Sequence, residues 1–261
     1  MTKRDTDETP WPIFVISLAA AQERRRAISA QLQALGLPFV LFDAIDARQG
    51  VPPEYEALID REGTQRNLGR PMSPGEYGCA LSHLLVYRRI CNEGLPGAIV
   101  LEDDAIVGPT FKSFVDQQAY RSAPFIQLDH KNARIWTLRP PVHHCDDFTI
   151  RQQVALSWLA TGYSLRRDVA CRIAEAGLPV RTVADWPEVV RQMEPFCAVP
   201  RVVDHPSAAE DISLIDAERA PLQAARQQER AADPAPPRWQ RYGSRAYWRH
   251  KFVKLTSRRV S

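Results

Sequence analysis

The sequence predicts an α/β fold with a mostly parallel central sheet, and three observations support this prediction. Residues 12–18 and 39–42 have the composition of buried strands. A helical pattern connects them, so the chain opens as a βαβ unit, which favours parallel pairing. Residues 97–101 form a third apolar run without polar alternation, as expected of a strand covered on both faces.

The composition is that of a globular protein. A chain of 261 residues with 44% hydrophobic content can bury a full core. There is no run of 18 apolar residues and no apolar signal-peptide core, so the cytoplasm is the expected compartment. The five cysteines are scattered and form no C-x-x-C pair. We therefore expect neither a disulfide framework nor a zinc site.

The charge is unevenly distributed along the chain. The net charge is +3, but residues 234–261 contain eight Lys and Arg residues and no acidic residue. This asymmetry indicates an appended basic arm with its own partner. We expect a polar leader at 1–11, one large domain at 12–216, a linker at 217–237 and a basic aromatic tail at 238–261.

A helix is predicted between the first two strands, whereas the segment after the second strand has no clear pattern. The apolar residues Ile28, Leu32 and Leu35 recur at helical spacing, and Gly36 is expected to end this helix. Residues 47–72 are predicted to be irregular, with a short helix around 54–60.

The second helix begins at a capping box. Ser73 is the expected N-cap, and Glu76 reaches back to it from three residues further on. The helix runs to about residue 92. Helical spacing places Cys79 and His83 on the same face as Glu76.

The rest of the chain is predicted as an alternation of short elements. We expect helices near 111–115 and 166–176, and strands near 125–128, 134–138 and 156–163. The strands at 125–128 and 134–138 are candidates for antiparallel pairing.

Three consecutive carboxylates follow the third strand: Glu102, Asp103 and Asp104. They fall at the carboxyl end of a strand, where open α/β sheets bind ligands. Like charges repel one another, so a divalent cation is their natural partner. The alternative is a solvated acidic turn.

Three blocks of the sequence resemble glycosyltransferase family 25. The first is VISL at 15–18, with Arg24 downstream and DAID at 43–46. The second is GEYGCALSHL at 75–84, and the third is LEDDA at 101–105. The blocks follow one another in the order and spacing of the family, and their joint match is specific.

This resemblance implies a GT-A-like nucleotide-sugar-binding fold for the large domain. It implies transfer of a sugar, with galactose the first expectation, from a UDP-sugar to a hydroxyl of a saccharide or lipid-linked acceptor. The expected pathway is lipopolysaccharide or surface-polysaccharide biosynthesis, and the expected mechanism is inverting. A Mn²⁺ or Mg²⁺ ion would neutralise the leaving diphosphate.

The resemblance also implies roles for individual residues. Asp104 and Glu102 are the expected metal ligands, and Asp103 is expected to orient the ion or the ribose. The residues expected at the donor are Ser17, Arg24, Glu76 and His83. Three of these have structural alternatives: Glu76 in the capping box, His83 as a satisfied helix-face histidine, and Arg24 as a solvated charge.

The proton acceptor has two candidates. An inverting transfer needs a base near the anomeric carbon, and carboxylates often fill this role. Asp185 is the first candidate because it matches an acidic position of the family, and Asp129 is its rival. Either residue could instead be a turn former or a surface charge.

The basic aromatic tail is expected to contact an anionic membrane surface at the inner face of the cytoplasmic membrane. A disordered basic tail is the alternative, and no nucleic-acid partner is expected. For the whole chain, a metal-dependent phosphohydrolase and a non-catalytic nucleotide-sugar-binding protein at the membrane are the competing functions.

Overall fold

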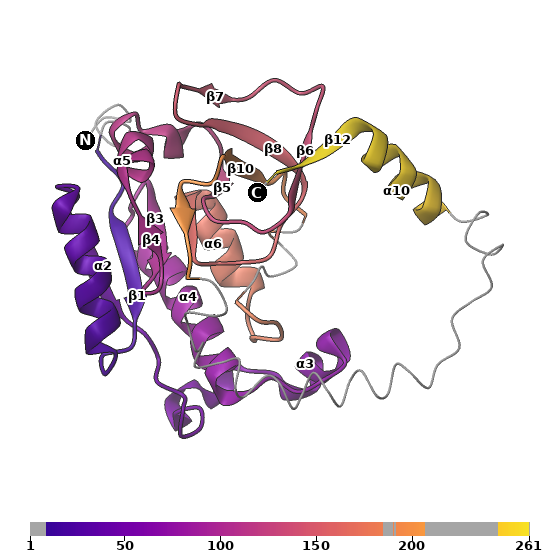
Figure 1. Cartoon of the computed structure of the whole chain (residues 1–261). Helices are drawn as coiled ribbons and strands as arrows, with labels where there is room; N and C mark the ends of the chain where they lie inside the picture. Colours follow the sequence, from indigo (N-terminus) through magenta and orange to yellow (C-terminus); the bar gives the residue numbers. More distant parts are fainter. Residues whose placement is uncertain (1–8, 185–189, 191, 207–244, 261) are drawn as a thin grey trace.

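The computed structural model describes residues 9–184, 190, 192–206 and 245–260. Within them, ten strands form one central sheet (Figure 1). Its path runs β12-β6-β8-β10-β5-β9-β3-β1-β2, and β7 pairs with β8. The strands are β1 (Ile13–Ser17), β2 (Val40–Asp43), β3 (Gly97–Glu102), β5 (Phe125–Gln127), β6 (Ala133–Trp136), β7 (His143–His144), β8 (Thr149–Ala155), β9 (Gly162–Arg166), β10 (Phe196–Val199) and β12 (Ser257–Val260).

The α/β class is confirmed, but the expectation of a mostly parallel sheet is wrong, because the sheet is mixed. Of the nine strand pairings in the described part of this sheet, three are parallel: β1 with β2, β1 with β3, and β5 with β10. The other six are antiparallel. Strand β9 lies between β3 and β5 and runs against both. Strands β5 to β8 follow one another without an intervening helix, and such direct connections favour antiparallel neighbours.

Helices cover both faces of the β1–β3 half of the sheet. They are α2 (Gln22–Ala34), α4 (Pro74–Asn92), α5 (Pro109–Asp116) and α6 (Arg167–Ala176). In β1, Val15 packs in one core cluster with residues of α2 and α5, whereas Phe14 packs in another with residues of α4 and α6. Successive side chains of a strand point to opposite faces, so β1 is buried on both sides.

The local predictions for the first half of the chain are largely confirmed. The βαβ opening is present, with β1 and β2 parallel. Helix α4 begins at the predicted capping box, in which Ser73 accepts from the Glu76 N–H and Glu76 accepts from the Ser73 N–H. Helix α2 ends where predicted, because Gly36 adopts a positive φ of 68°.

Two local predictions are wrong. The segment at 47–72 contains, besides the 3-10 helix Pro53–Leu58, the helix α3 (Arg61–Leu68), which Asp60 caps by accepting from the Gly63 N–H. The strand expected at 156–163 is also misplaced. Residues 156–161, including the apolar run at 156–160, connect β8 to β9, and only Gly162 and Tyr163 belong to a strand.

A disulfide connects the two helices on one face of the sheet. Cys91 of α4 and Cys171 of α6 are bonded, with their Cα atoms 5.6 Å apart. Their separation of 80 residues gave no signal in the sequence, and the expectation that no disulfide framework is present did not foresee this bond.

The predicted tail is described over residues 245–260. It consists of the helix α10 (Arg245–Thr256) and the strand β12, which pairs with β6 at the edge of the sheet. The predicted linker at 217–237 lies outside the described residues. None of the helices in the described part of the chain combines the length and apolar character that crossing a bilayer requires.

Candidate functional site

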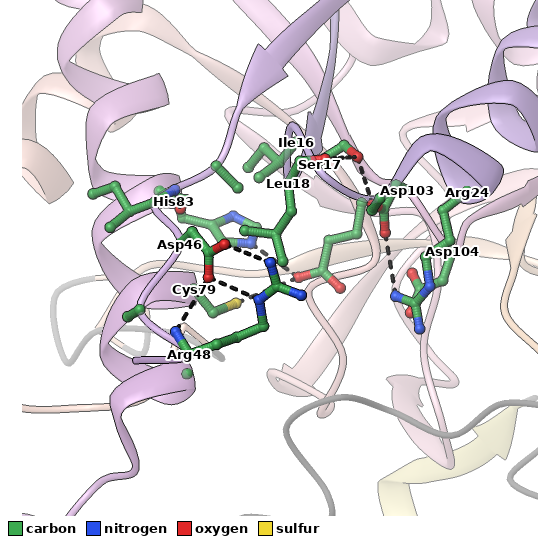
Figure 2. Close-up of a pocket in the computed structure, with 17 residues that line it drawn as sticks. Ile16, Ser17, Leu18, Arg24, Asp46, Arg48, Cys79, His83, Asp103 and Asp104 are labelled. Atoms are coloured by element: carbon green, nitrogen blue, oxygen red, sulfur yellow. Dashed lines mark hydrogen bonds and ion pairs between the residues drawn. The ribbon is translucent and has the colours of Figure 1, made fainter. Parts of the chain in front are cut away.

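The carboxyl ends of β1, β2 and β3 lie side by side at one edge of the sheet. Ile16 of β1 pairs with Glu102 of β3, and Ser17 pairs with Asp43 of β2. A pocket opens at this edge, with helix α4 as a further wall (Figure 2). The polar residues that line it are Ser17, Arg24, Asp46, Arg48, Cys79, Ser82, His83, Glu102, Asp103 and Asp104.

Asp103 is held by β1 and α2. Its Oδ2 accepts a hydrogen bond of 2.6 Å from the Ser17 hydroxyl, and its Oδ1 accepts from the Arg24 guanidinium at 3.3 Å. Burial raises the pKa of Asp103, and the hydrogen bond from Ser17 and the charge of Arg24 act in the opposite direction. Three predicted donor-site residues, Ser17, Arg24 and Asp103, therefore form one connected group.

Glu102 faces helix α4 instead. Its Oε1 lies 2.9 Å from Nε2 of His83 and 3.9 Å from the sulfur of Cys79. Cys79 and His83 are one helical turn apart, so α4 presents both side chains to the end of β3. Glu102 thus contacts α4, whereas the next residue, Asp103, contacts β1 and α2.

A buried chain of two tyrosines supports His83. Nδ1 of His83 lies 2.7 Å from the Tyr163 hydroxyl, which lies 2.9 Å from the Tyr87 hydroxyl. All three side chains are buried, and burial raises the pKa of both tyrosines. The sequence did not indicate these tyrosines, because Tyr163 reaches the site from β9, 80 residues after His83.

Asp104 lines the pocket together with the other two carboxylates. Among the described residues, one group of three His, Cys, Asp or Glu side chains has its ligand atoms within 4.8 Å of one another, and that group is Cys79, His83 and Glu102. The three carboxylates therefore do not form a closed oxygen cage. The two predicted ligands, Glu102 and Asp104, both line the open pocket. This suits Mn²⁺ or Mg²⁺, which commonly take one or two carboxylates plus oxygens of the substrate phosphates.

Glu76 pairs with Arg70 and does not line the pocket. Its two carboxylate oxygens accept from the Arg70 guanidinium at 2.8 and 2.7 Å, and one also accepts from the Ser73 N–H. The Glu76 side chain is 1% exposed and that of Arg70 is 10% exposed. This geometry gives Glu76 the structural role that the capping box indicated, and Glu76 is not among the residues that line the pocket.

Helix α4 approaches the segment after β2 very closely. A Cβ added to Gly78 would lie 2.8 Å from the carbonyl oxygen of Ile45, so a larger residue would push the helix away. The Ser82 hydroxyl accepts from the Ile45 N–H at 2.9 Å. This contact brings Asp46 and Arg48, which form an ion pair at 2.6 Å, to the rim of the pocket. The sequence had indicated no role for Arg48.

Asp129 lies at the carboxyl end of β5, at the same edge of the sheet but outside the pocket lining. It is fully buried, and its Oδ2 lies 2.8 Å from Nδ1 of His205. Burial raises the pKa of Asp129, and the charge of His205 opposes this shift. Asp185, the other candidate base, lies outside the described residues.

His205 reaches this edge through a short two-stranded sheet. Strand β11 (Val203–Asp204) pairs with β4 (Ile106–Val107), which follows Asp104 in the chain. Asp204 pairs with Ile106, so His205 lies next to the segment that carries Asp104. The sequence did not indicate His205, because its partner Asp129 is 76 residues away.

Comparison with known proteins identifies relatives. Residues 11–180 match glycosyltransferase family 25, described as an LPS biosynthesis protein. The chain is 27% identical over 183 residues to a lacto-N-neotetraose biosynthesis glycosyltransferase, LgtE, of Neisseria meningitidis serogroup B, covering 66% of this chain and 64% of the relative. It is 32% identical over 111 residues to LgtB of Neisseria meningitidis serogroup A, covering 42% and 38%.

The chain thus spans less than two thirds of the length of these relatives. Among solved structures, a mannose-1-phosphate geranyltransferase from Thermus thermophilus is similar over 75% of each chain, with 13% identity and a TM-score of 0.39.

Proposed function

The chain belongs to glycosyltransferase family 25, and from this membership we propose that it transfers a sugar from a UDP-sugar to a hydroxyl of a saccharide acceptor. The proposed pathway is lipopolysaccharide or a related surface polysaccharide, and the proposed donor is UDP-galactose. One observation carries the proposal: residues of all three family-like blocks, with Ser17, His83 and Asp103 as examples, line a single pocket.

The pocket offers groups that suit a nucleoside diphosphate. Arg24 supplies positive charge beside Asp103, and Gly75 places the N-terminus of α4 at the pocket wall. A helix N-terminus favours anions, because its partial positive charge faces them. We assign the diphosphate to this region and the ribose hydroxyls to the carboxylate of Asp103.

Asp104 and Glu102 are the residues that would hold a Mn²⁺ or Mg²⁺ ion. Both supply carboxylate oxygens, the ligands that these ions prefer. When bound, the ion supplies positive charge for the diphosphate as the glycosidic bond breaks. Asp103 is less suited to this role, because Ser17 and Arg24 already engage both of its oxygens.

We assign the proton transfer of an inverting reaction to His205 or to Asp185. The buried Asp129 cannot itself meet an acceptor hydroxyl, but its contact with Nδ1 of His205 orients the ring. A carboxylate that orients a histidine base is a common arrangement for removing a proton from a hydroxyl. In this scheme Asp129 is a positioning residue.

UDP binding by the purified chain tests the proposal most directly. We expect calorimetry to detect UDP binding that depends on Mn²⁺ and is lost in Asp104→Ala. The control is Asp116→Ala, which removes an exposed carboxylate of α5 far from the pocket lining. Equal affinity in the Asp104→Ala variant would remove this carboxylate from the mechanism.

A panel of UDP-sugars with saccharide acceptors then separates the competing functions. Sugar transfer supports the proposal, with UDP-galactose as the expected donor. Release of inorganic phosphate without transfer would indicate a phosphohydrolase. Tight UDP-sugar binding with neither transfer nor slow donor hydrolysis would indicate a non-catalytic binding protein.

A further inference from the structure

We propose that Cys79, His83 and Glu102 form a binding site for Zn²⁺. It lies beside the proposed Mn²⁺ or Mg²⁺ site, and the carboxylate of Glu102 is common to both. The sulfur, the ring nitrogen and a carboxylate oxygen of these side chains lie within 4.8 Å of one another. The proposal does not depend on glycosyl transfer, because it rests on this cluster alone.

The spacing of the three ligand atoms suits a tetrahedral ion. Zinc bonds of about 2.0–2.3 Å place neighbouring ligand atoms of a tetrahedral site roughly 3.3–3.6 Å apart. Here Glu102 Oε1 lies 2.9 Å from Nε2 of His83 and 3.9 Å from the Cys79 sulfur. Shifts of a few tenths of an ångström would bring these two distances into that range. The sulfur and the ring nitrogen lie within 4.8 Å of each other, so the Cys79 side chain would also have to move toward His83.

The chemistry of the cluster distinguishes it from the neighbouring carboxylates. A thiolate and an imidazole favour Zn²⁺ over Mn²⁺ or Mg²⁺, which prefer oxygen. Zn²⁺ sites with three protein ligands keep a fourth position open. All three side chains line the pocket, so that position would face the pocket. Binding would release the Cys79 thiol proton to solvent.

The tyrosine chain behind His83 supplies the support that a zinc-bound histidine needs. Ligand histidines commonly donate their second ring N–H to a hydrogen-bond acceptor, which fixes the tautomer. Nδ1 of His83 lies 2.7 Å from the Tyr163 hydroxyl, which donates in turn to Tyr87. With Nδ1 donating to Tyr163, Nε2, which faces Glu102 in this structure, is the nitrogen that would bind the ion.

Cobalt spectroscopy of the purified, chelator-treated chain tests the site. We expect Co²⁺ to produce a thiolate-to-cobalt charge-transfer band, and Zn²⁺ to remove it by displacement. Cys79→Ser should abolish the band. Cys145→Ser is the matched control, since Cys145, like Cys79, is half-buried and outside the disulfide, and it should keep the band.

Two further variants test His83 and the tyrosine that supports it. His83→Gln should lower Zn²⁺ affinity, measured by competition with a chromophoric chelator, by more than tenfold. Tyr163→Phe removes one hydroxyl and should lower it by about 10- to 100-fold, as loss of a supporting hydrogen bond does in other metal sites. Circular dichroism of each variant checks that the fold is intact.

The charge-transfer band decides whether the site exists. Absence of the band in the wild-type chain, or its survival in Cys79→Ser, would overturn the proposal and leave the cluster as a hydrogen-bonded network. Asp104→Ala should keep the band even though it should lose Mn²⁺-dependent UDP binding. The failure of one proposal can therefore be told from the failure of the other.

Discussion

Asp103 carries the clearest electrostatic consequence among single residues. Its pKa is raised, chiefly because folding buries the carboxyl, although Ser17 and Arg24 stabilise the charged form. A carboxyl with a raised folded-state pKa contributes stability below its unfolded-state pKa. That contribution is lost as the pH rises through the folded-state pKa.

We therefore expect Asp103→Asn to gain stability relative to the wild-type chain as the pH rises from about 4 to 7. The gain should be about 1.4 kcal/mol for each unit by which folding raises the pKa. Urea denaturation across this pH range measures it. Asp116→Asn, which removes an exposed carboxylate on α5, is the control. A difference between Asp103→Asn and wild type that does not change with pH would contradict this account.

His205 and Asp129 give a second prediction for single residues. If His205 removes the acceptor proton, His205→Gln should lower kcat by about 10²- to 10⁴-fold, the usual contribution of a general base. The KM for the donor should change little, because neither residue lines the donor pocket. Asp129→Asn should also lower kcat, because the ring of His205 would lose its orienting carboxylate.

His144→Gln provides the matched control, since His144 is exposed on β7 and should be dispensable. Steady-state kinetics of transfer measure all of these variants. Full activity in His205→Gln combined with a large loss in Asp185→Asn would assign the base to Asp185.

At the scale of the element, helix α4 contributes both to the stability of the fold and to the pocket. Its first turn is fixed by the buried pair of Glu76 and Arg70, and its third turn presents His83 to the pocket. Removing one partner of a buried ion pair leaves the other charge unpaired, which is costly. The position of the site residues on α4 therefore depends on a contact outside the pocket.

We expect Glu76→Gln to lower the free energy of unfolding by about 3–5 kcal/mol, because Arg70 would remain buried without its carboxylate. Glu62→Gln is the control. It breaks the exposed pair with Arg66, so it should cost at most about 1 kcal/mol. Urea denaturation measures both. A loss below about 1 kcal/mol in Glu76→Gln would show that the pair does not anchor the helix.

The elements that could be predicted are those with local signals. The capping box at Ser73 and Glu76, the apolar run of β3 and the glycine after α2 each act within a few residues, and each prediction is confirmed. Helix α3 also had local signals, an Asp60 N-cap and a Gly69 with φ of 65°, but its polar composition lacks an apolar stripe.

Contacts between distant residues explain the rest. The sequence placed Ser17, Arg24 and Asp103 in one site through family resemblance, but not the hydrogen bonds among them. It missed Tyr163, which β9 brings to His83, and His205, which follows β11 and lies next to the segment that carries Asp104. Whether a strand pairs parallel or antiparallel depends on which strands lie beside it in the folded sheet. The residue pattern within one strand does not contain this information.

At the scale of the whole molecule, the pocket and helix α10 lie at different places on the sheet. The pocket lies at the carboxyl ends of β1, β2 and β3, near the edge strand β2. Helix α10 adjoins β12, the edge strand on the other side of the sheet (Figure 1). The exposed apolar residues of α10 recur at helical spacing: Trp248 is 62%, Phe252 60% and Leu255 83% exposed. Basic residues of the same helix, such as Lys251, would suit anionic lipid headgroups.

The membrane role of the tail is best tested by substitutions within α10. Deleting residues 238–261 would also remove β12 and uncover the edge of β6, so any change in binding would have two explanations. Replacing Trp248, Phe252 and Leu255 together by Glu leaves the strand in place. Val40→Glu is the matched control, since Val40 is an exposed apolar residue on β2, at the far edge of the sheet.

We expect the wild-type chain and Val40→Glu to pellet with vesicles that contain phosphatidylserine, and less with purely phosphatidylcholine vesicles. The triple variant should remain in the supernatant, because it replaces the apolar face by negative charge. Raising the salt concentration should weaken the pelleting of the wild-type chain, since surface charges are screened. Equal pelleting of the triple variant and the wild-type chain would exclude α10 as the contact with the membrane.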